Sequence, residues 1–386
     1  MIYLDNSATT RAHDGVIDVV QDVMRNVIGN PSSLHGLGGQ AERLVTQARE
    51  VIARFVGCDT QEVLFTSGGT EANNLAIKGI AKAYQNRGNH IITSSIEHPS
   101  VFEVCKQLEN EGWKVSYLPV DQTGRVRAQD VEKEITKDTV LVSIMHVNNE
   151  VGSIQPIHEI GQLLKRYHKI FFHVDAVQSF SKIPLSVTEC GVDLMSVSGH
   201  KFHGPNGIGF LYKRRGVMLD PLLTGGGQEF GFRSGTHDVA SIAGLARAIV
   251  QAEKERKAFL MRSRTWKEML IDRFRQDLSH FTLNGSLSAC SAPYILSISF
   301  PGLKAEVLVH ALAKRDCYVS SKSACSSKLE MPSRILKAMK KTDQEALGSI
   351  RISMGFDTTE QDISMFAETL IDVVPQLQHV MKVYTK

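Results

Sequence analysis

Short apolar runs alternate with helical patterns along much of this 386-residue chain. The runs have the length of β-strands and occur at residues 62–65, 90–93, 140–146, 170–174 and 194–198. Amphipathic stretches, such as residues 71–83 and 157–167, separate most of them. Parallel strands need crossover connections, which are usually helices, so this alternation predicts an α/β protein with a largely parallel sheet covered by helices.

The rhythm changes after a charged helical stretch at residues 253–274. Beyond it, strand patterns at residues 281–283, 294–300 and 350–353 mix with helical ones, which favours a smaller α+β domain. A chain of this length usually forms two domains. We predict a large domain at residues 15–255, which would carry the main sheet, and a small domain made of residues 1–14 and 256–386.

Composition excludes several classes of protein. Hydrophobic residues make up 42% and charged residues 22%, as in ordinary folded domains. The net charge is only +3 and the basic residues are scattered, so no direct contact with nucleic acid is expected. The start of the chain has no signal-peptide pattern, and no apolar run approaches the length of a membrane span. We therefore expect a cytoplasmic protein without membrane contact.

The six cysteines lie far apart and form no C-x-x-C pair. This spacing argues against both a disulfide framework and a zinc ribbon. At most one or two of these cysteines are therefore expected to take part in chemistry.

Polar residues that follow apolar runs are the first candidates for a site, because ligands of open α/β sheets gather at the carboxyl ends of the strands. One such segment is TSGGTE at residues 66–71, which opens a helix. The backbone N–H groups of Gly68, Gly69 and Thr70 suit a phosphate there. Taken alone, the segment also fits an ordinary strand-to-helix turn.

Asp175 ends another apolar run, in FFHVDAVQ at residues 171–178. A carboxylate buried at a strand end needs a cationic partner, and the protonated ring nitrogen of pyridoxal 5′-phosphate (PLP) is one. Gln178, on the next turn, is then expected near the oxygen of the cofactor ring. The alternative interpretation of Asp175 is a helix N-cap.

Lys201 lies in SVSGHKFHGP at residues 196–205, directly after an apolar run. Lysines are seldom buried without a function, and a Schiff-base lysine loses its proton more easily beside other positive charge. Ser198 and His200 are expected to bind the cofactor phosphate. His200 and His203 also have a spacing seen in metal sites, but no acidic or cysteine ligand accompanies them, so no metal is expected.

His98 follows the run at residues 90–93 within the segment SIEH. Its imidazole is suited to stack on a flat aromatic ring and to move protons, although a lone histidine is usually structural. None of these four segments is specific alone. Their combination along alternating strands predicts a PLP pocket.

Several short motifs resemble the NifS/IscS cysteine desulfurases over nearly the whole chain. In the family's order they are DNSATT (5–10), GNPSS (29–33), GGTE (68–71), HVNNE (146–150), SGHK (198–201), GGGQE (225–229), RSGT (233–236), SAC (323–325) and IRIS (350–353). The resemblance implies a homodimeric PLP-dependent transferase of fold type I, with a mainly parallel seven-stranded sheet in the large domain. It also implies that Asn149 lies near the cofactor ring and that Thr236 reaches the PLP phosphate bound by the partner subunit.

Cys325 lies in SSKSACSSK at residues 320–328, a small polar run typical of a surface loop. Lys322 and Lys328 favour its thiolate, whereas the other cysteines lie beside apolar or helical segments, where an inert thiol is the usual state. The residues alone leave both a reactive and an inert Cys325 open. The resemblance implies that Cys325, in the small domain, forms a persulfide.

The resemblance further implies that L-cysteine becomes L-alanine through a PLP aldimine with Lys201. Arg351 would bind the substrate carboxylate with its planar fork. Lys201 or His98 would remove the Cα proton, and the Cys325 thiolate would attack the substrate sulfur. Free cysteine and selenocysteine are not distinguished as substrates.

Two features concern the sulfur acceptor. Lys322 stands where many relatives have glycine, and the chain stops soon after a helical stretch that ends near residue 383. Docking to an iron–sulfur scaffold and supply of sulfur to a tRNA-thiolating enzyme are therefore both open.

Two alternatives compete with the desulfurase interpretation. Another fold-type I PLP enzyme, such as a selenocysteine lyase, an aminotransferase or a kynureninase-like hydrolase, would use Lys201 and Asp175 but not Cys325. A non-catalytic adaptor that binds a sulfur-relay partner is disfavoured by the complete set of candidate residues.

Overall fold

The computed structural model describes residues 1–321 and 332–384. Its centre is a seven-stranded sheet of order β2-β8-β7-β6-β5-β3-β4. The strands are β2 (Val63–Thr66), β3 (His90–Ser94), β4 (Lys114–Leu118), β5 (Thr139–Met145), β6 (Phe171–Asp175), β7 (Leu194–Ser198) and β8 (Gly209–Lys213). Only β8 runs antiparallel to its neighbours β2 and β7, so the predicted α/β class with a mainly parallel seven-stranded sheet is confirmed.

Helices cover both faces of this sheet, which explains why its central strands are continuous apolar runs. Leu64, Leu141 and Leu194 belong to a core on one face, together with side chains of α3 (Gly69–Ala83) and α4 (Pro99–Asn110). The alternate strand residues belong to a core on the other face. That core includes side chains of α1 (Asp14–Asn26), α2 (Gly36–Val56), α5 (Ala128–Glu134), α6 (Ile157–Leu164) and the first part of α7 (Val239–Asp277).

A separate apolar core lies around a smaller antiparallel sheet of order β12-β10-β9. Its strands are β9 (Thr282–Asn284), β10 (Ile295–Ser299) and β12 (Ser349–Ser353). Helices α8 (Ala305–Ala313) and α11 (Glu360–Tyr384) contribute side chains to this core, whereas the buried side chains of α9 (Arg334–Ala338) and α10 (Asp343–Leu347) belong to a core of the large sheet. The N-terminal strand β1 (Ile2–Tyr3) pairs in parallel with β11 (Cys317–Tyr318), and Leu4 lies fully buried in this second core. Residues 2–4 at the extreme N-terminus thus pack with the C-terminal part of the chain.

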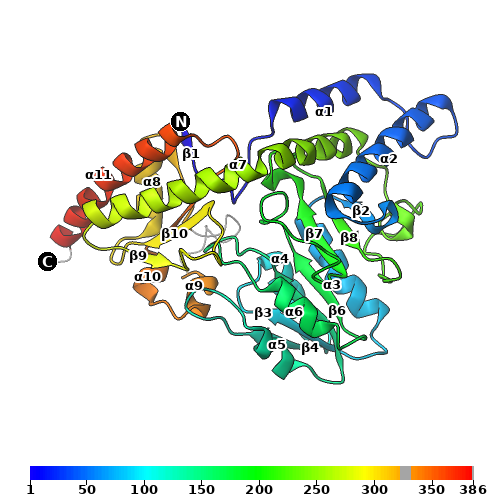
Figure 1. Ribbon diagram of the computed structural model, residues 1–386, viewed down its shortest axis with the longest axis horizontal. Coiled ribbons are helices and arrows are strands. Elements are labelled where there is room, and N and C mark those ends of the chain that lie inside the picture. Colours follow the sequence, from blue (N-terminus) through cyan, green and yellow to red (C-terminus); the bar gives the residue numbers. More distant parts are fainter. Residues whose placement is uncertain (322–331, 385–386) are drawn as a thin grey trace.

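Helix α7 extends from the large sheet to the smaller one as a single 39-residue helix (Figure 1). It is longer than the predicted helix at residues 253–274, because its first turns also pack into the core of the large sheet. Residue 255 lies inside it, so the boundary between residues 15–255 and 256–386 stays a prediction. In the part of the chain that the structure describes, no helix combines the length and apolar character needed to span a bilayer.

Two strands of the large sheet, β4 and β8, are not predicted from apolar runs in the sequence. β4 has the sequence KVSYL and lies at the sheet edge, where only Leu118 is fully buried. β8, with the sequence GFLYK, is entirely buried, but a lysine and a tyrosine interrupt its apolar pattern. Lys213 is accommodated because its Nζ donates to the carbonyl oxygen of Val217 over 3.0 Å.

Candidate active site

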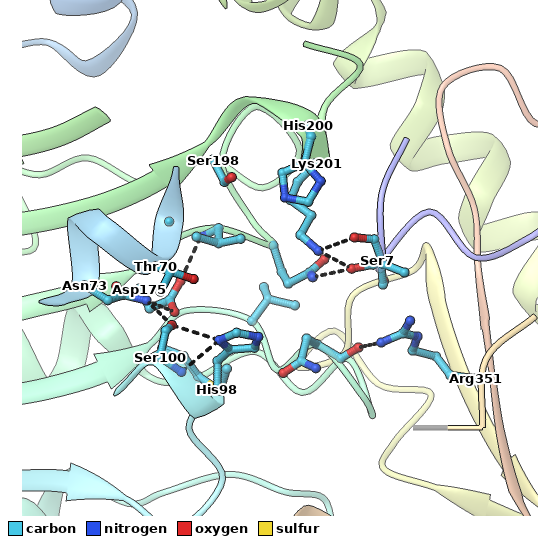
Figure 2. Close-up of a pocket in the computed structure, with 17 residues that line it drawn as sticks. Ser7, Thr70, Asn73, His98, Ser100, Asp175, Ser198, His200, Lys201 and Arg351 are labelled. Atoms are coloured by element: carbon cyan, nitrogen blue, oxygen red, sulfur yellow. Dashed lines mark hydrogen bonds between the residues drawn. The ribbon is translucent and has the colours of Figure 1, made fainter. Parts of the chain in front are cut away.

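A pocket lies at the carboxyl ends of the central strands and is closed on one side by the N-terminal segment and β12 (Figure 2). It brings together most of the residues predicted from the four segments. The residues that line it include Gly69, Thr70, His98, Asn149, Asp175, Gln178, Ser198, His200, Lys201 and Arg351. Strands far apart in the sequence therefore contribute to one site, as expected for an open α/β sheet.

One end of the pocket is the N-terminus of α3. Gly68 is the N-cap, with φ of 148°, a conformation that favours glycine, and no side chain caps the helix. A Cβ atom at Gly69 would lie 2.6 Å from Cγ2 of Val177, so only glycine fits this close approach. The uncapped N–H groups of this helix, with Ser198 and His200 beside them in the pocket lining, suit an anionic group such as a phosphate.

Asp175 lies on the pocket floor at the end of β6 and is only 4% exposed. Its Oδ2 accepts a hydrogen bond of 2.8 Å from Asn73 Nδ2, and its Oδ1 accepts one of 3.0 Å from the backbone N–H of Val177. Burial raises the pKa of Asp175, while these two donors act in the opposite direction. The residues after Asp175 form turns instead of a helix, so the helix N-cap interpretation does not apply.

Lys201 ends the short 3₁₀ helix η2 (Gly199–Lys201) that follows β7. Its Nζ donates to the carbonyl oxygens of Ser7 and Ala8, over 2.6 and 2.7 Å (Figure 2). Both acceptors belong to the DNSATT motif. The motif was part of the family resemblance, but sequence reasoning assigned no site role to Ser7 or Ala8.

His98 is the N-cap of α4, and its Nδ1 accepts a hydrogen bond of 3.2 Å from the backbone N–H of Ser100. Desolvation by burial, together with the nearby cations of Lys201, Arg334 and Arg351, lowers the pKa of His98 to about 4. His98 is therefore a neutral imidazole at neutral pH. Burial and the charge of Lys201 also lower the pKa of His200, to about 4.

Two carboxamide side chains of the pocket are incompletely satisfied. Gln178 Nε2 donates to the carbonyl oxygen of Ser7 over 2.9 Å, but its Oε1 is buried without a hydrogen-bond partner among the described residues. Within the same described ranges, Oδ1 of the buried Asn149 has no partner either. Buried polar groups without partners are uncommon and often mark a binding site.

Arg351 lies on β12, with its side chain only 2% exposed. Its Nη1 donates to the carbonyl oxygen of Asn149 over 2.9 Å, and its Nη2 pairs with Asp5 Oδ1 over 2.7 Å. Nε is buried and has no acceptor within residues 1–321 and 332–384. A guanidinium with an unused N–H at the pocket wall is suited to bind a carboxylate.

One of the predicted site residues is not brought to this pocket, and another is not among the residues that the structure describes. Thr236 is exposed and does not line it, which leaves its predicted contact with the partner subunit's cofactor as a prediction. Cys325 lies outside the described residues.

The histidine pair with metal-like spacing, His200 and His203, makes hydrogen-bond contacts with other segments of the chain. His200 Nδ1 lies 3.0 Å from Thr9 Oγ1, and His203 Nδ1 lies 2.8 Å from the carbonyl oxygen of Arg11. Nε2 of His203 accepts from the backbone N–H of Phe356 over 3.1 Å. These contacts tie the N-terminal segment and the C-terminal part of the chain to the loop that carries Lys201.

Sequence reasoning missed Asn73 and Ser100, both buried in the pocket lining. Asn73 lies three residues after Thr70 on α3 and therefore on the same helix face. A polar residue among the buried alanine and leucine residues of that helix was the available signal. Its partners could not be read from the sequence, because Asp175 is 102 residues away.

Comparisons with known proteins agree with this geometry. Residues 2–366 match the family model described as aminotransferase class-V. The cysteine desulfurase IscS of Pectobacterium carotovorum is 44% identical over 98% of this chain and 93% of its own length. A solved structure of a NifS-like protein has 38% identity and a TM-score of 0.91, covering 97% of this chain and all of the other. A structure titled SspA in complex with cysteine has 35% identity and a TM-score of 0.80, covering 93% of this chain and all of the other.

The fold and the pocket thus define an α/β enzyme of the class-V aminotransferase type. Within that class, the chain belongs to the NifS/IscS cysteine desulfurase family.

Proposed function

We propose that this protein is a PLP-dependent cysteine desulfurase, which converts L-cysteine to L-alanine and transfers the sulfur atom to Cys325. The observation that carries the proposal is the placement of Lys201, Asp175 and Arg351 in one pocket. An amine, a buried carboxylate and a guanidinium are the groups needed for an amino-acid substrate on PLP. The relatives named cysteine desulfurase support the choice of cysteine.

The pocket fits the parts of PLP. Gly69, Thr70, Ser198 and His200 would hold the phosphate at the uncapped start of α3. A protonated ring nitrogen would give the buried Asp175 the cationic partner that it needs. The partnerless carboxamide oxygens of Asn149 and Gln178, and the imidazole of His98, lie in the same lining as the remaining candidates for contact with the ring.

When bound, PLP withdraws electrons from the substrate Cα through its protonated ring. The rest of the reaction depends on groups of the chain. Asp175 keeps a proton on the ring nitrogen, Lys201 supplies the amine that holds the cofactor and accepts the Cα proton, and Arg351 orients the carboxylate. The paired N–H groups of Arg351 set the direction of the Cα–H bond relative to Lys201.

Cys325 completes the sulfur transfer in this proposal. Its thiolate would attack the substrate sulfur and form a new S–S bond, while the Cβ–S bond of the substrate breaks and leaves its electron pair on the three-carbon unit. Protonation of the remaining three-carbon unit releases alanine and leaves a persulfide on Cys325.

Exchange of Cys325 for serine separates this proposal from other fold-type I chemistry. The Cys325→Ser protein is expected to retain the cofactor spectrum and to lose persulfide and nearly all alanine formation. If this variant released sulfide from cysteine at the full rate without an added thiol, the persulfide route would be wrong. The protein would then be a fold-type I enzyme that does not use Cys325, such as a selenocysteine lyase or aminotransferase.

The first measurement is the visible absorption spectrum of the purified protein before and after L-cysteine is added. Alanine release and a gain of about 32 Da on Cys325, detected by mass spectrometry, are the expected results. A protein without PLP absorbance would contradict the cofactor assignment and would favour the adaptor alternative.

The wider context is also part of the proposal. We infer a cytoplasmic homodimer that passes sulfur to an acceptor protein, either a tRNA-thiolating enzyme or an iron–sulfur scaffold. A pull-down with the persulfidated protein distinguishes the two acceptors. Recovery of an iron–sulfur scaffold alone would contradict the tRNA-thiolation route.

A further inference from the structure

A buried hydrogen-bond chain connects Asp175 on the pocket floor to His98 at its edge (Figure 2). Asn73 Nδ2 donates to Asp175 Oδ2 and to Ser100 Oγ, over 2.8 Å in both cases. Ser100 Oγ lies 2.8 Å from His98 Nδ1. Asn73 is only 1% exposed and Ser100 only 9%, so water does not compete for these contacts. The chain joins three separate elements, namely β6, α3 and the start of α4.

The chemistry of the groups determines the direction of each hydrogen bond. An ionised carboxylate only accepts, so Asn73 presents its NH₂ group to Asp175 and uses both protons, one on Asp175 and one on Ser100. Ser100 Oγ accepts from Asn73, and its single proton is therefore available for His98. The backbone N–H of Ser100, which can only donate, also points at His98 Nδ1. Two donors thus converge on one ring nitrogen.

A nitrogen that accepts two hydrogen bonds carries no proton. In a neutral imidazole the proton must then be on the other nitrogen, Nε2. The Nε2 atom of His98, which lines the pocket, is then a hydrogen-bond donor.

We infer that Asn73 and Ser100 are positioning residues, which link Asp175 to His98 and hold His98 as the Nε2–H tautomer in the pocket. The inference rests on the proposed function only for its mechanistic meaning, since the contacts lie within the chain itself. His98 would then act as a hydrogen-bond donor, through Nε2–H, to substrate or product. Lys201 would be the group that takes the Cα proton, which decides between the two bases that the sequence left open.

The charged groups around His98 agree with this assignment. The cations that disfavour the imidazolium are Lys201 after β7, Arg334 on α9 and Arg351 on β12. The carboxylate of the hydrogen-bond chain, Asp175, is connected to His98 only through the neutral side chains of Asn73 and Ser100. The pKa of about 4 for His98 has burial as its main cause. Hydrogen-bond donors on Nδ1 stabilise the same neutral form.

The test is a nitrogen-15 NMR spectrum of the PLP-bound enzyme labelled at its histidine side chains, recorded as a function of pH. The His98→Gln protein identifies the His98 signals. The expected spectrum has a bare Nδ1 and a protonated Nε2 at neutral pH. A spectrum with the proton on Nδ1 would overturn the inference.

Three variants test the link itself. Ser100→Ala removes one donor from Nδ1, so the proton affinity of His98 is expected to rise about tenfold, which is one pKa unit. Asn73→Ala leaves the Ser100 hydroxyl unfixed, and a rise of about threefold is expected. Asn74→Ala is the matched control, because Asn74 neighbours Asn73 but bonds only to the backbone of Thr70 on its own helix.

The double variant Asn73→Ala with Ser100→Ala is the deciding experiment. If Asn73 acts on His98 through Ser100, the double variant has the same His98 pKa as Ser100→Ala alone. Independent, additive shifts would contradict the link, as would an equal shift in Asn74→Ala.

These signals do not depend on which substrate the enzyme uses. If the native protein showed no desulfurase activity, the proposed function would be wrong, but the assignment of the His98 tautomer would still stand. A Nδ1–H spectrum would remove the inference and leave the proposed function in place.

Discussion

The two walls of the pocket are built in different ways. The cofactor wall consists of Gly69, Asn73, His98, Asp175, Ser198 and Lys201, which follow strands of the large sheet or lie on the helices after them. The arginine wall is Arg351, which lines the pocket, together with the two residues that support it, Asp5 and Ser320. These three residues meet because the N-terminus packs beside β11 and β12.

The hydrogen bonds of the two walls differ accordingly. In the cofactor wall, Asp175 is anchored by Asn73 on helix α3 and by the backbone N–H of Val177 in the turn after β6. In the arginine wall, a single oxygen, Oδ1 of Asp5, accepts from both Ser320 and Arg351, each over 2.7 Å. The residues proposed to contact the cofactor ring are thus held by the large sheet and its helices, whereas the residue proposed for the substrate carboxylate is held where the N-terminal segment meets the C-terminal part of the chain.

The largest effect is expected from removal of the amine in the cofactor wall. Lys201→Ala should lower alanine formation about 10⁴-fold, because the variant lacks both the cofactor linkage and the base. The rate of alanine release and borohydride trapping of PLP measure this. Lys82→Ala, at an exposed lysine paired with Asp220, is the control. Substantial alanine formation by Lys201→Ala would mean that the cofactor wall does not contain the essential base.

A smaller effect is expected when the fork of the arginine wall is replaced by a point charge. Arg351→Lys should raise KM for L-cysteine by about 10- to 100-fold, since the ammonium group cannot bind a carboxylate through two parallel N–H groups. The cofactor spectrum should not change. Steady-state kinetics provides KM, with Arg166→Lys on the surface as the control. An unchanged KM would exclude Arg351 as the carboxylate site.

Acid is expected to weaken the large sheet behind the cofactor wall. Burial lowers the pKa of His173 on β6 to about 3, against the ordinary value of 6.5. Stability from the neutral ring is complete above pH 6.5 and declines as the pH falls toward 3, because the unfolded chain binds a proton that the folded one does not. At pH 5 the loss in the free energy of unfolding from this histidine amounts to about 2 kcal/mol.

Urea unfolding at pH 7 and pH 5 measures this loss, and hydrogen exchange locates it. Amides of β5 to β7 should lose protection before those of β10 and β12. His173→Gln should reduce the pH dependence, although it also loses the contacts with Ser143 and Ser196. An equal pH dependence in native protein and variant would show that other groups cause the acid sensitivity.

The smallest effect is expected at the junction of the arginine wall. Ser320→Ala removes the hydroxyl that donates to Asp5 and should lower the free energy of unfolding by about 1 kcal/mol. Urea unfolding measures it, with Ser286→Ala in an exposed loop as the control. The cofactor spectrum should remain that of the native protein. A changed spectrum would show that the two walls are coupled, which would break the comparison.

Much of the cofactor wall could be predicted from the sequence, because its residues mark the ends of strands and the starts of helices. Asp175 and Ser198 end buried strands, and Gly69 opens the helix after β2, so periodicity places them at one edge of the sheet. Asn73 and Ser100 could not be assigned, because both are helical residues whose partners include side chains of other elements.

The arginine wall was less accessible to sequence reasoning. The position of Arg351 came from a family motif, and its partner Asp5 is 346 residues away in the chain. No periodicity relates two residues at that distance. Their meeting depends on the pairing of β1 with β11 and on the bridge between Asp5 and Ser353.

The amino-acid sequence by itself determined the α/β class, the strand ends that carry the polar residues, and the family. Apolar periodicity and short motifs are local properties, and the hydrophobic effect converts them directly into buried strands and covered faces. Only the tertiary structure decided which donor meets which acceptor, including Asn73 with Asp175 and Asp5 with Arg351. Hydrogen bonds form only when the donor–acceptor distance is correct to within a few tenths of an ångström. That precision exists only once the helices and strands are packed.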